Sequence, residues 1–124
     1  MAKILVIEDN PAIGLVIQIT LTDQGHQVDL RKNALDALTL MRNGTIPDLI
    51  LTDLIMKEMS GKDLVRRIRE DHLLHDLPVV IITGCFPDSK ILPDPDEFQG
   101  LLMKPFDIND LITIVADLTS TKAA

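Results

Sequence analysis

Short apolar runs alternate with segments of helical periodicity along the whole chain. Runs of this length, bounded by turn-forming residues, are typical of buried strands in a parallel sheet. A further stretch, Gln27–Arg31, alternates apolar and polar positions, as a half-exposed edge strand does. The sequence therefore predicts five strands, at about residues 3–8, 27–31, 49–53, 79–83 and 99–103.

Helices are predicted between and after these strands, and each begins with a recognisable signal. Asn10 and Pro11 combine a capping side chain with a proline at the first helical position. Gly25 and Gly44 end the first two helices, and the last is expected to end near Leu118, followed by a frayed end over 119–124. The remaining start signals are Asn33, Ser60 with Asp63, and Asp107 with Asp110.

The interval Gly84–Gly100 breaks this rhythm. It contains Pro87, Pro93 and Pro95, and each proline inside a helix costs about 3 kcal/mol or more. A full fourth helix is therefore not expected. We predict at most a short helical segment over 87–92 and a further capped turn over 94–97.

Alternation of strands and helices from end to end predicts the α/β class. The expected architecture is a doubly wound, five-stranded parallel sheet in the flavodoxin-like order 2-1-3-4-5, with an irregular or shortened fourth helix. We expect one domain over residues 1–120, a frayed carboxyl terminus over 121–124 and no effector domain.

Composition narrows the possible functions. The 124 residues carry 19 acidic and 12 basic side chains, a formal net charge of −7, which argues against direct nucleic-acid binding. Arg66, Arg67 and Arg69 are interpreted as the solvated face of one helix.

No apolar stretch is long enough for a membrane span or a secretory signal. The single cysteine, Cys85, is interpreted as an inert buried thiol and fits a cytoplasmic protein.

Chemically useful side chains stand where the predicted strands end. Glu8 and Asp9 follow the first strand, Asp53 ends the third, Thr83 ends the fourth and Lys104 follows the fifth. The carboxyl ends of parallel strands open onto one edge of the sheet, so these groups are expected to converge. An oxygen-only acidic cluster suits Mg²⁺, or Mn²⁺, and a carboxylate beside bound metal can accept a phosphoryl group.

These features resemble the receiver domains of two-component response regulators, from Lys3 to about Leu118. The matching segments are Glu8–Asp9, Asp53–Met56, Met59–Gly61, Thr83–Gly84 and Lys104–Phe106.

The resemblance implies a signalling switch rather than an enzyme. Asp53 would accept a phosphoryl group from a histidine kinase or phosphotransfer protein, and Thr83 and Lys104 would contact its oxygens. Asp9, Asp53 and the backbone carbonyl of Ile55 would bind Mg²⁺, with Glu8 reaching the ion through water. The family's cis peptide bond would fall between Lys104 and Pro105, where proline makes it accessible.

Three positions depart from the family pattern. Lys57 replaces a common proline, Gly84 replaces a small alanine, and Leu101 stands where many receivers carry a Tyr or Phe that moves on activation. Without that ring, we expect signalling to proceed through backbone motion around Gly84–Gly100. The acceptor site is therefore predicted to be complete and the output surface to be altered.

Other readings remain open from the sequence. An unphosphorylated interaction module would keep the fold and use its surface alone. A small Mg²⁺-dependent phosphatase of the haloacid-dehalogenase type would need a second carboxylate at position 55, where this chain has Ile55. An FMN-binding flavodoxin would need a glycine- and hydroxyl-rich loop after the first strand. The output partner is undetermined, and a monomer or weak homodimer is expected.

Overall fold

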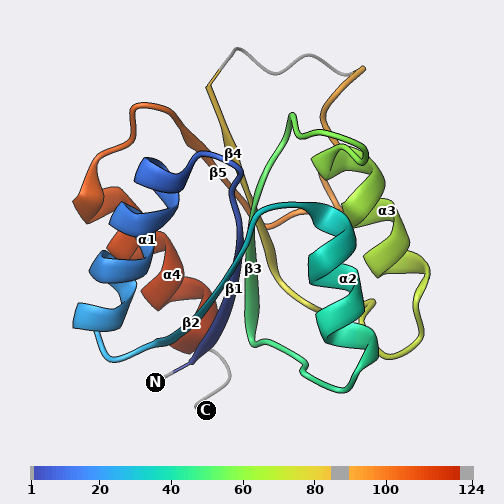
Figure 1. Ribbon diagram of the computed structural model, residues 1–124, viewed down its shortest axis with the longest axis horizontal. Coiled ribbons are helices and arrows are strands. Elements are labelled where there is room, and N and C mark those ends of the chain that lie inside the picture. The colour runs from blue at the N-terminus through green and yellow to red at the C-terminus, as the bar shows by residue number, and fades with distance from the viewer. Residues whose placement is uncertain (1, 85–89, 121–124) are drawn as a thin grey trace.

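A single sheet of five parallel strands forms the centre of the molecule (Figure 1). The computed structural model describes residues 2–84 and 90–120. The strand order is β2-β1-β3-β4-β5, which confirms the predicted topology. The strands are β1 (Lys3–Ile7), β2 (Gln27–Arg31), β3 (Leu49–Asp53), β4 (Val79–Thr83) and β5 (Gly100–Met103).

Helices cover both faces of the sheet. In Figure 1, α1 and α4 lie on one side, and α2 and α3 lie on the other. The capping signals act as predicted, since Asn10 Oδ1 accepts from the backbone N–H of Ala12 and Ser60 Oγ accepts from that of Asp63. The helices are α1 (Pro11–Asp23), α2 (Ala34–Arg42), α3 (Gly61–Glu70) and α4 (Ile108–Ser120).

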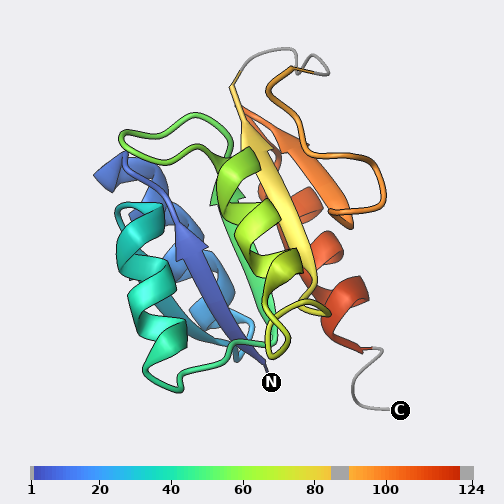
Figure 2. The same ribbon diagram turned by 90° about the vertical axis from the view of Figure 1, so that its right-hand side faces the viewer.

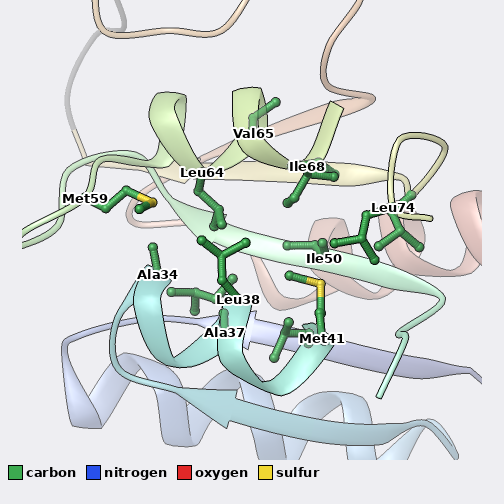
Figure 3. Close-up of a cluster of buried hydrophobic side chains, with 14 of the residues drawn as sticks. Ala34, Ala37, Leu38, Met41, Ile50, Met59, Leu64, Val65, Ile68 and Leu74 are labelled. Atoms are coloured by element: carbon green, nitrogen blue, oxygen red, sulfur yellow. The ribbon is translucent and has the colours of Figure 1, made fainter. Parts of the chain in front are cut away.

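Strands β1, β3 and β4 contribute alternate side chains to two hydrophobic cores. Leu5 and Ile7 of β1 point toward α2 and α3, whereas Ile4 and Val6 point toward α1 and α4. Figure 3 shows the first core, where Leu64 and Ile68 of α3 meet side chains of α2 across β3. Burial on both faces explains why β1, β3 and β4 are continuous apolar runs, whereas the edge strand β2 alternates apolar and polar residues.

The predicted carboxyl-terminal end of the last helix, near Leu118, was wrong by two residues. Thr119 and Ser120 are helical, and their hydroxyls donate to the carbonyls of Val115 and Asp117 at 2.7 and 3.2 Å. Both hydroxyls thus bond back to carbonyls of the preceding turn, in a helical end that lies past Leu118, where the apolar pattern stops. The predicted frayed segment 121–124 lies outside the described residues.

The connection between β4 and β5 contains no helix in its described part, residues 90–99 (Figure 2). Residues 94–97 form a single turn closed by the Glu97 N–H donating to the Asp94 carbonyl at 2.8 Å. The Glu97 carboxylate caps the same turn by accepting from the Asp94 N–H at 3.0 Å. The described part of the connection therefore agrees with the prediction that a full fourth helix is absent. Pro87 and Cys85 lie outside the described residues.

Arg69 of α3 holds this irregular connection against the domain. Its five N–H donors make five hydrogen bonds, all to neutral acceptors. The acceptors are the carbonyls of His75 and Leu77, the carbonyl of Glu97 twice, and Oε1 of Gln99, at 2.7 to 3.1 Å. The interpretation of Arg69 as a solvated side chain was therefore wrong, because its acceptors come from distant segments that only the folded chain assembles.

Gln99 extends this network into the sheet. Its side-chain oxygen also accepts from the Val79 N–H at 2.8 Å, and its own N–H donates to the Val79 carbonyl at 2.8 Å. One guanidinium thus joins the end of α3, the α3–β4 loop and the segment leading into β5. These links replace part of the packing that a fourth helix would supply.

We predict that Arg69→Lys lowers the free energy of unfolding by about 2 kcal/mol, because an ammonium cannot reproduce the five-donor fork. Urea denaturation followed by circular dichroism measures this change. Arg67→Lys is the matched control, since the Arg67 side chain is exposed on the same helix and makes no hydrogen bond to other described residues. Equal stability of the Arg69 and Arg67 variants would contradict the assigned role.

Candidate functional site

The predicted site residues converge at the carboxyl edge of the sheet. Asp53 is the last residue of β3 and Thr83 the last of β4, while Glu8 and Asp9 follow β1 directly. The Lys104 N–H donates to the Thr83 carbonyl at 2.7 Å, which continues the pairing of β5 with β4 by one residue. The register of the strands therefore brings these residues to the same edge of the sheet. Their side chains are long enough to contact one another there.

Lys104 bridges two buried carboxylates. Its Nζ lies 2.9 Å from Glu8 Oε1 and 2.9 Å from Asp53 Oδ1. Glu8 is 2% exposed and Asp53 is 3% exposed, so both charges are almost completely removed from water. The second oxygen of Glu8 accepts from the Asn10 N–H at 3.1 Å, which fixes the carboxylate at the start of α1.

The acidic groups outnumber the cation that neutralises them. Glu8, Asp9 and Asp53 each offer a carboxylate oxygen within 4.8 Å of the others, and Asp9 is exposed to solvent. Glu8 Oε1 and Asp53 Oδ1 make no hydrogen bond of good geometry within the described chain, although both are ion-paired with Lys104. Three carboxylates around one ammonium leave net negative charge, and this donor set is compatible with a Mg²⁺ site.

Burial and mutual repulsion shift the titration of this cluster. Burial, followed by the neighbouring Glu8, raises the pKa of Asp53 to about 8 despite the contact with Lys104. Burial also acts to raise the pKa of Glu8, but contacts with Asp53, Lys104 and the Asn10 N–H outweigh it and lower that pKa. Desolvation acts to lower the pKa of Lys104, yet its two carboxylate partners raise it overall. Lys104 therefore stays charged near neutral pH.

A small pocket of about 210 Å³ opens beside these groups. Ile55, 65% exposed, forms part of its wall just after the end of β3. Glu8 is not among the lining residues, so it acts from beneath the pocket rather than at its surface. The lining residues are Asp9, Asp53, Leu54, Ile55, Ile82, Thr83, Gly84 and Lys104.

The loop after β3 ties Asp53 to the first turn of α3. The Gly61 N–H donates to the Leu54 carbonyl at 2.7 Å, and a β-carbon on Gly61 would lie 2.3 Å from the Asp53 carbonyl oxygen. Only glycine permits this close approach. The sequence alone identified Gly61 as part of a motif, but it did not reveal this reason for the glycine. Lys57, at the position of the usual proline, accepts at its carbonyl from the Met59 N–H at 2.8 Å in a tight turn.

Two further expectations are met at this edge. The peptide bond between Lys104 and Pro105 is cis. At Gly84, the nearest atom of the described residues to an added β-carbon would be a carbon of the Lys104 side chain, at 3.8 Å, which is ordinary van der Waals contact for the alanine common in the family. Leu101 packs, partly buried, against the core that also holds Ile91 and Phe98.

Comparison with known proteins decides the family. A family model described as the response regulator receiver domain matches residues 4–116. The chain belongs to this family. It is a receiver domain of the type found in two-component response regulators and histidine kinases, and receiver domains are signalling switches.

Curated relatives show this domain in two settings. The chain is 34% identical to the sensor histidine kinase TmoS of Ectopseudomonas mendocina over 98% of its length, which is 12% of that kinase. It is 30% identical to the response regulator Rre1 of Synechocystis over 98% of its length, which is 53% of that regulator. The receiver domain is thus a part of each of these longer proteins.

Solved structures agree with the fold. A response regulator receiver domain from Clostridium thermocellum has a TM-score of 0.86 at 29% identity, covering 99% of this chain and 98% of that one. The chemotaxis response regulator CheY4 of Vibrio cholerae has a TM-score of 0.82 at 25% identity, with 95% and 98% coverage.

Among the described residues, no helix is both long and apolar enough to cross a bilayer.

We predict that Asp53→Asn stabilises the receiver domain by about 2 kcal/mol at pH 8, because it removes a buried charge from an over-acidic cluster. Between the ordinary carboxyl pKa of 3.8 and about 8, the folded protein binds more protons than the unfolded one, so wild-type stability falls as the pH rises. The advantage of the variant should therefore grow from pH 4 to pH 8 and then level off.

Urea unfolding across this pH range measures the difference. Asp23→Asn is the control, since Asp23 is an exposed acid in α1, far along the chain from the cluster. If the free energies of unfolding of Asp53→Asn and the wild type differ by the same amount at all pH values, the raised pKa assigned to Asp53 is refuted.

Proposed function

We propose that this receiver domain accepts a phosphoryl group on Asp53 in a Mg²⁺-dependent reaction and so switches between two signalling states. The observation that carries the proposal is the pairing of Lys104 with both Asp53 and Glu8 at 2.9 Å inside an acidic cluster. An ammonium already held against the acceptor carboxylate can stabilise charge on an incoming phosphoryl oxygen.

The residues present fit a divalent ion. Asp9, Asp53 and the backbone carbonyl of Ile55 would hold Mg²⁺, or Mn²⁺, and Glu8 would reach it through water. When bound, the ion supplies positive charge that draws phosphoryl oxygens toward the acceptor. The excess of carboxylates over cations supports this assignment, because it leaves the cluster under-neutralised without a further positive charge.

Asp53 would act as the nucleophile. One of its carboxylate oxygens forms a bond to phosphorus while the nitrogen–phosphorus bond of a phosphohistidine donor breaks and the imidazole leaves. Lys104 and the Thr83 hydroxyl would hold two of the phosphoryl oxygens. Thr83 is 3% exposed and lines the same pocket as Asp53, as this role requires.

The partner would be a histidine kinase or a histidine-containing phosphotransfer protein, since receiver domains interact with such proteins and the relatives include sensor kinases. The donor protein would bind in an apolar groove of about 510 Å³. This groove adjoins the acceptor pocket, because both are lined by Gly84 and Lys104. Val16 of α1, 44% exposed, and Ile108, 48% exposed, lie along it. Helix α1 bears no charged residue before Asp23, so its exposed face suits an apolar protein surface.

We predict that acetyl phosphate with Mg²⁺ adds one phosphoryl group to the wild-type domain, detected by intact-mass spectrometry, and that Asp53→Asn abolishes the adduct. Chelation with EDTA should prevent labelling. Asp23→Asn is the control and should label normally. Absence of an adduct on the wild type would sink the proposal and favour an unphosphorylated interaction module, whereas steady turnover of a phosphatase substrate would favour an enzyme.

Metal binding has a readout that does not depend on labelling. Mg²⁺ should raise the melting temperature of the wild type, because a ligand that binds only the folded state stabilises it. Asp9→Asn should lose most of this shift. A full Mg²⁺-dependent shift in that variant would contradict the role of Asp9.

We predict that Val16→Glu slows phosphoryl transfer from a histidine phosphotransfer domain that labels the wild type by about tenfold or more, because it buries a charge at the donor surface. Labelling by acetyl phosphate, which needs no docking surface, should stay unchanged. Thr22→Glu, exposed near the far end of α1, is the control. A uniform loss with both donors would show damage to the acceptor site instead.

A further inference from the structure

A second cavity, of about 370 Å³, lies between α3, the loop after β3 and the β4–β5 connection. Its floor is apolar, with Leu54, Met56 and Ile91 among the lining residues, and the latter two pack against the hydrophobic core. Its remaining lining residues are Ile55, Ser60, Lys62, Asp63, Arg66 and Lys90. Among the residues that the structure describes, this cavity shares only Leu54 and Ile55 with the acceptor pocket, so it is treated as a separate site.

The rim of this cavity is positively charged on a strongly acidic chain. Among the described lining residues, Lys62, Arg66 and Lys90 outnumber one carboxylate, Asp63, whereas the whole chain carries 19 acidic and 12 basic residues. Like charges placed together repel each other, and no carboxylate lies within ion-pair distance of Lys62 or Arg66 in the described chain. Local charge of this sign is complementary to an acidic partner.

Two observations fix the rim in place. Lys62 Nζ donates to the Lys90 carbonyl at 3.1 Å, which joins α3 to the β4–β5 connection across the cavity. Arg69, two turns further along α3, holds the other end of the same connection. The cationic rim therefore belongs to an anchored surface rather than to independent side chains.

We propose that this cavity docks an acidic, amphipathic segment of an output protein. A carboxylate of the segment would lie between Lys62 and Arg66, and an aliphatic side chain beside it would enter the apolar floor. Nucleic acid fits less well, because the described lining holds no aromatic ring on which a base could stack. A second copy of this chain fits less well, because two chains of net charge −7 repel each other.

The cavity is joined to the acceptor by the backbone. Its walls include Leu54 and Ile55, the two residues that follow Asp53, and the Gly61 N–H binds the Leu54 carbonyl at 2.7 Å. Movement of the acceptor loop would therefore change the cavity. This second step rests on the proposed function, since it makes the affinity for the acidic segment depend on the state of Asp53.

The test uses fluorescence anisotropy with a short fluorescein-labelled peptide of alternating glutamate and leucine. The wild-type domain should bind it, and binding should weaken as salt is added. Peptides with glutamine in place of glutamate, or serine in place of leucine, should bind at least about tenfold more weakly. Equal binding of the glutamate and glutamine peptides, or no binding at all, would overturn the proposal.

Matched variants locate the site. Arg66→Glu should weaken binding by about tenfold or more, whereas Arg67→Glu should change it less than about twofold. The two arginines are adjacent and both exposed, but only Arg66 lines the cavity. Equal losses would indicate general attraction to a basic helix and would overturn the assignment. Tighter binding of a duplex DNA than of the peptide would also do so.

A final arm separates docking from switching. Beryllofluoride with Mg²⁺, a stand-in for the phosphoryl group, should change the peptide affinity of the wild type by about threefold or more and leave Asp53→Asn unchanged. Peptide binding without a beryllofluoride adduct would keep the docking surface and reject the proposed function. An adduct that leaves the affinity unchanged would reject the coupling alone.

Discussion

The contact of Lys104 with two buried carboxylates is the interaction on which the site depends. A carboxylate removed from water is costly unless a positive charge compensates it, and two such groups beside one ammonium are compensated only in part. The strand register imposes this arrangement, because Glu8, Asp53 and Lys104 all leave the same edge of the sheet. The fold thus holds together a cluster whose negative charges repel one another. Such a cluster is expected at a site that binds further positive charge.

This constraint explains what the sequence could predict. The strand ends were visible because each buried apolar run stops at a polar or charged residue, and the rules of parallel sheets place those ends together. The convergence of Asp53, Thr83 and Lys104 on one pocket followed from this reasoning, and the structure confirms it. The alternation of strands and helices predicted a doubly wound sheet, whose usual strand order the structure confirms, and the prolines after β4 argued against a full fourth helix, in agreement with the described residues 90–99.

Features that depend on distant partners could not be predicted in this way. Arg69 occurs in a basic stretch that is typical of a solvated helix face, yet its acceptors lie on two loop segments that meet only after folding. Gly61 was recognised as part of a motif, but the reason for it is a carbonyl oxygen of Asp53 that no local pattern reveals. The helical end at Thr119 and Ser120 was missed because these two residues are polar and continue no apolar pattern beyond Leu118.

Anchoring by hydrogen bonds has a consequence for how this receiver domain can transmit a signal. A packed fourth helix moves as a unit, whereas a connection held by Arg69 near Glu97 and by Lys62 near Lys90 is fixed at separate points. Both anchors start from α3, and the first turn of α3 is bound to the backbone that follows Asp53. Under the proposed function, a change at Asp53 would therefore reach the described part of the connection through α3, by a route that does not include the side chain of Leu101.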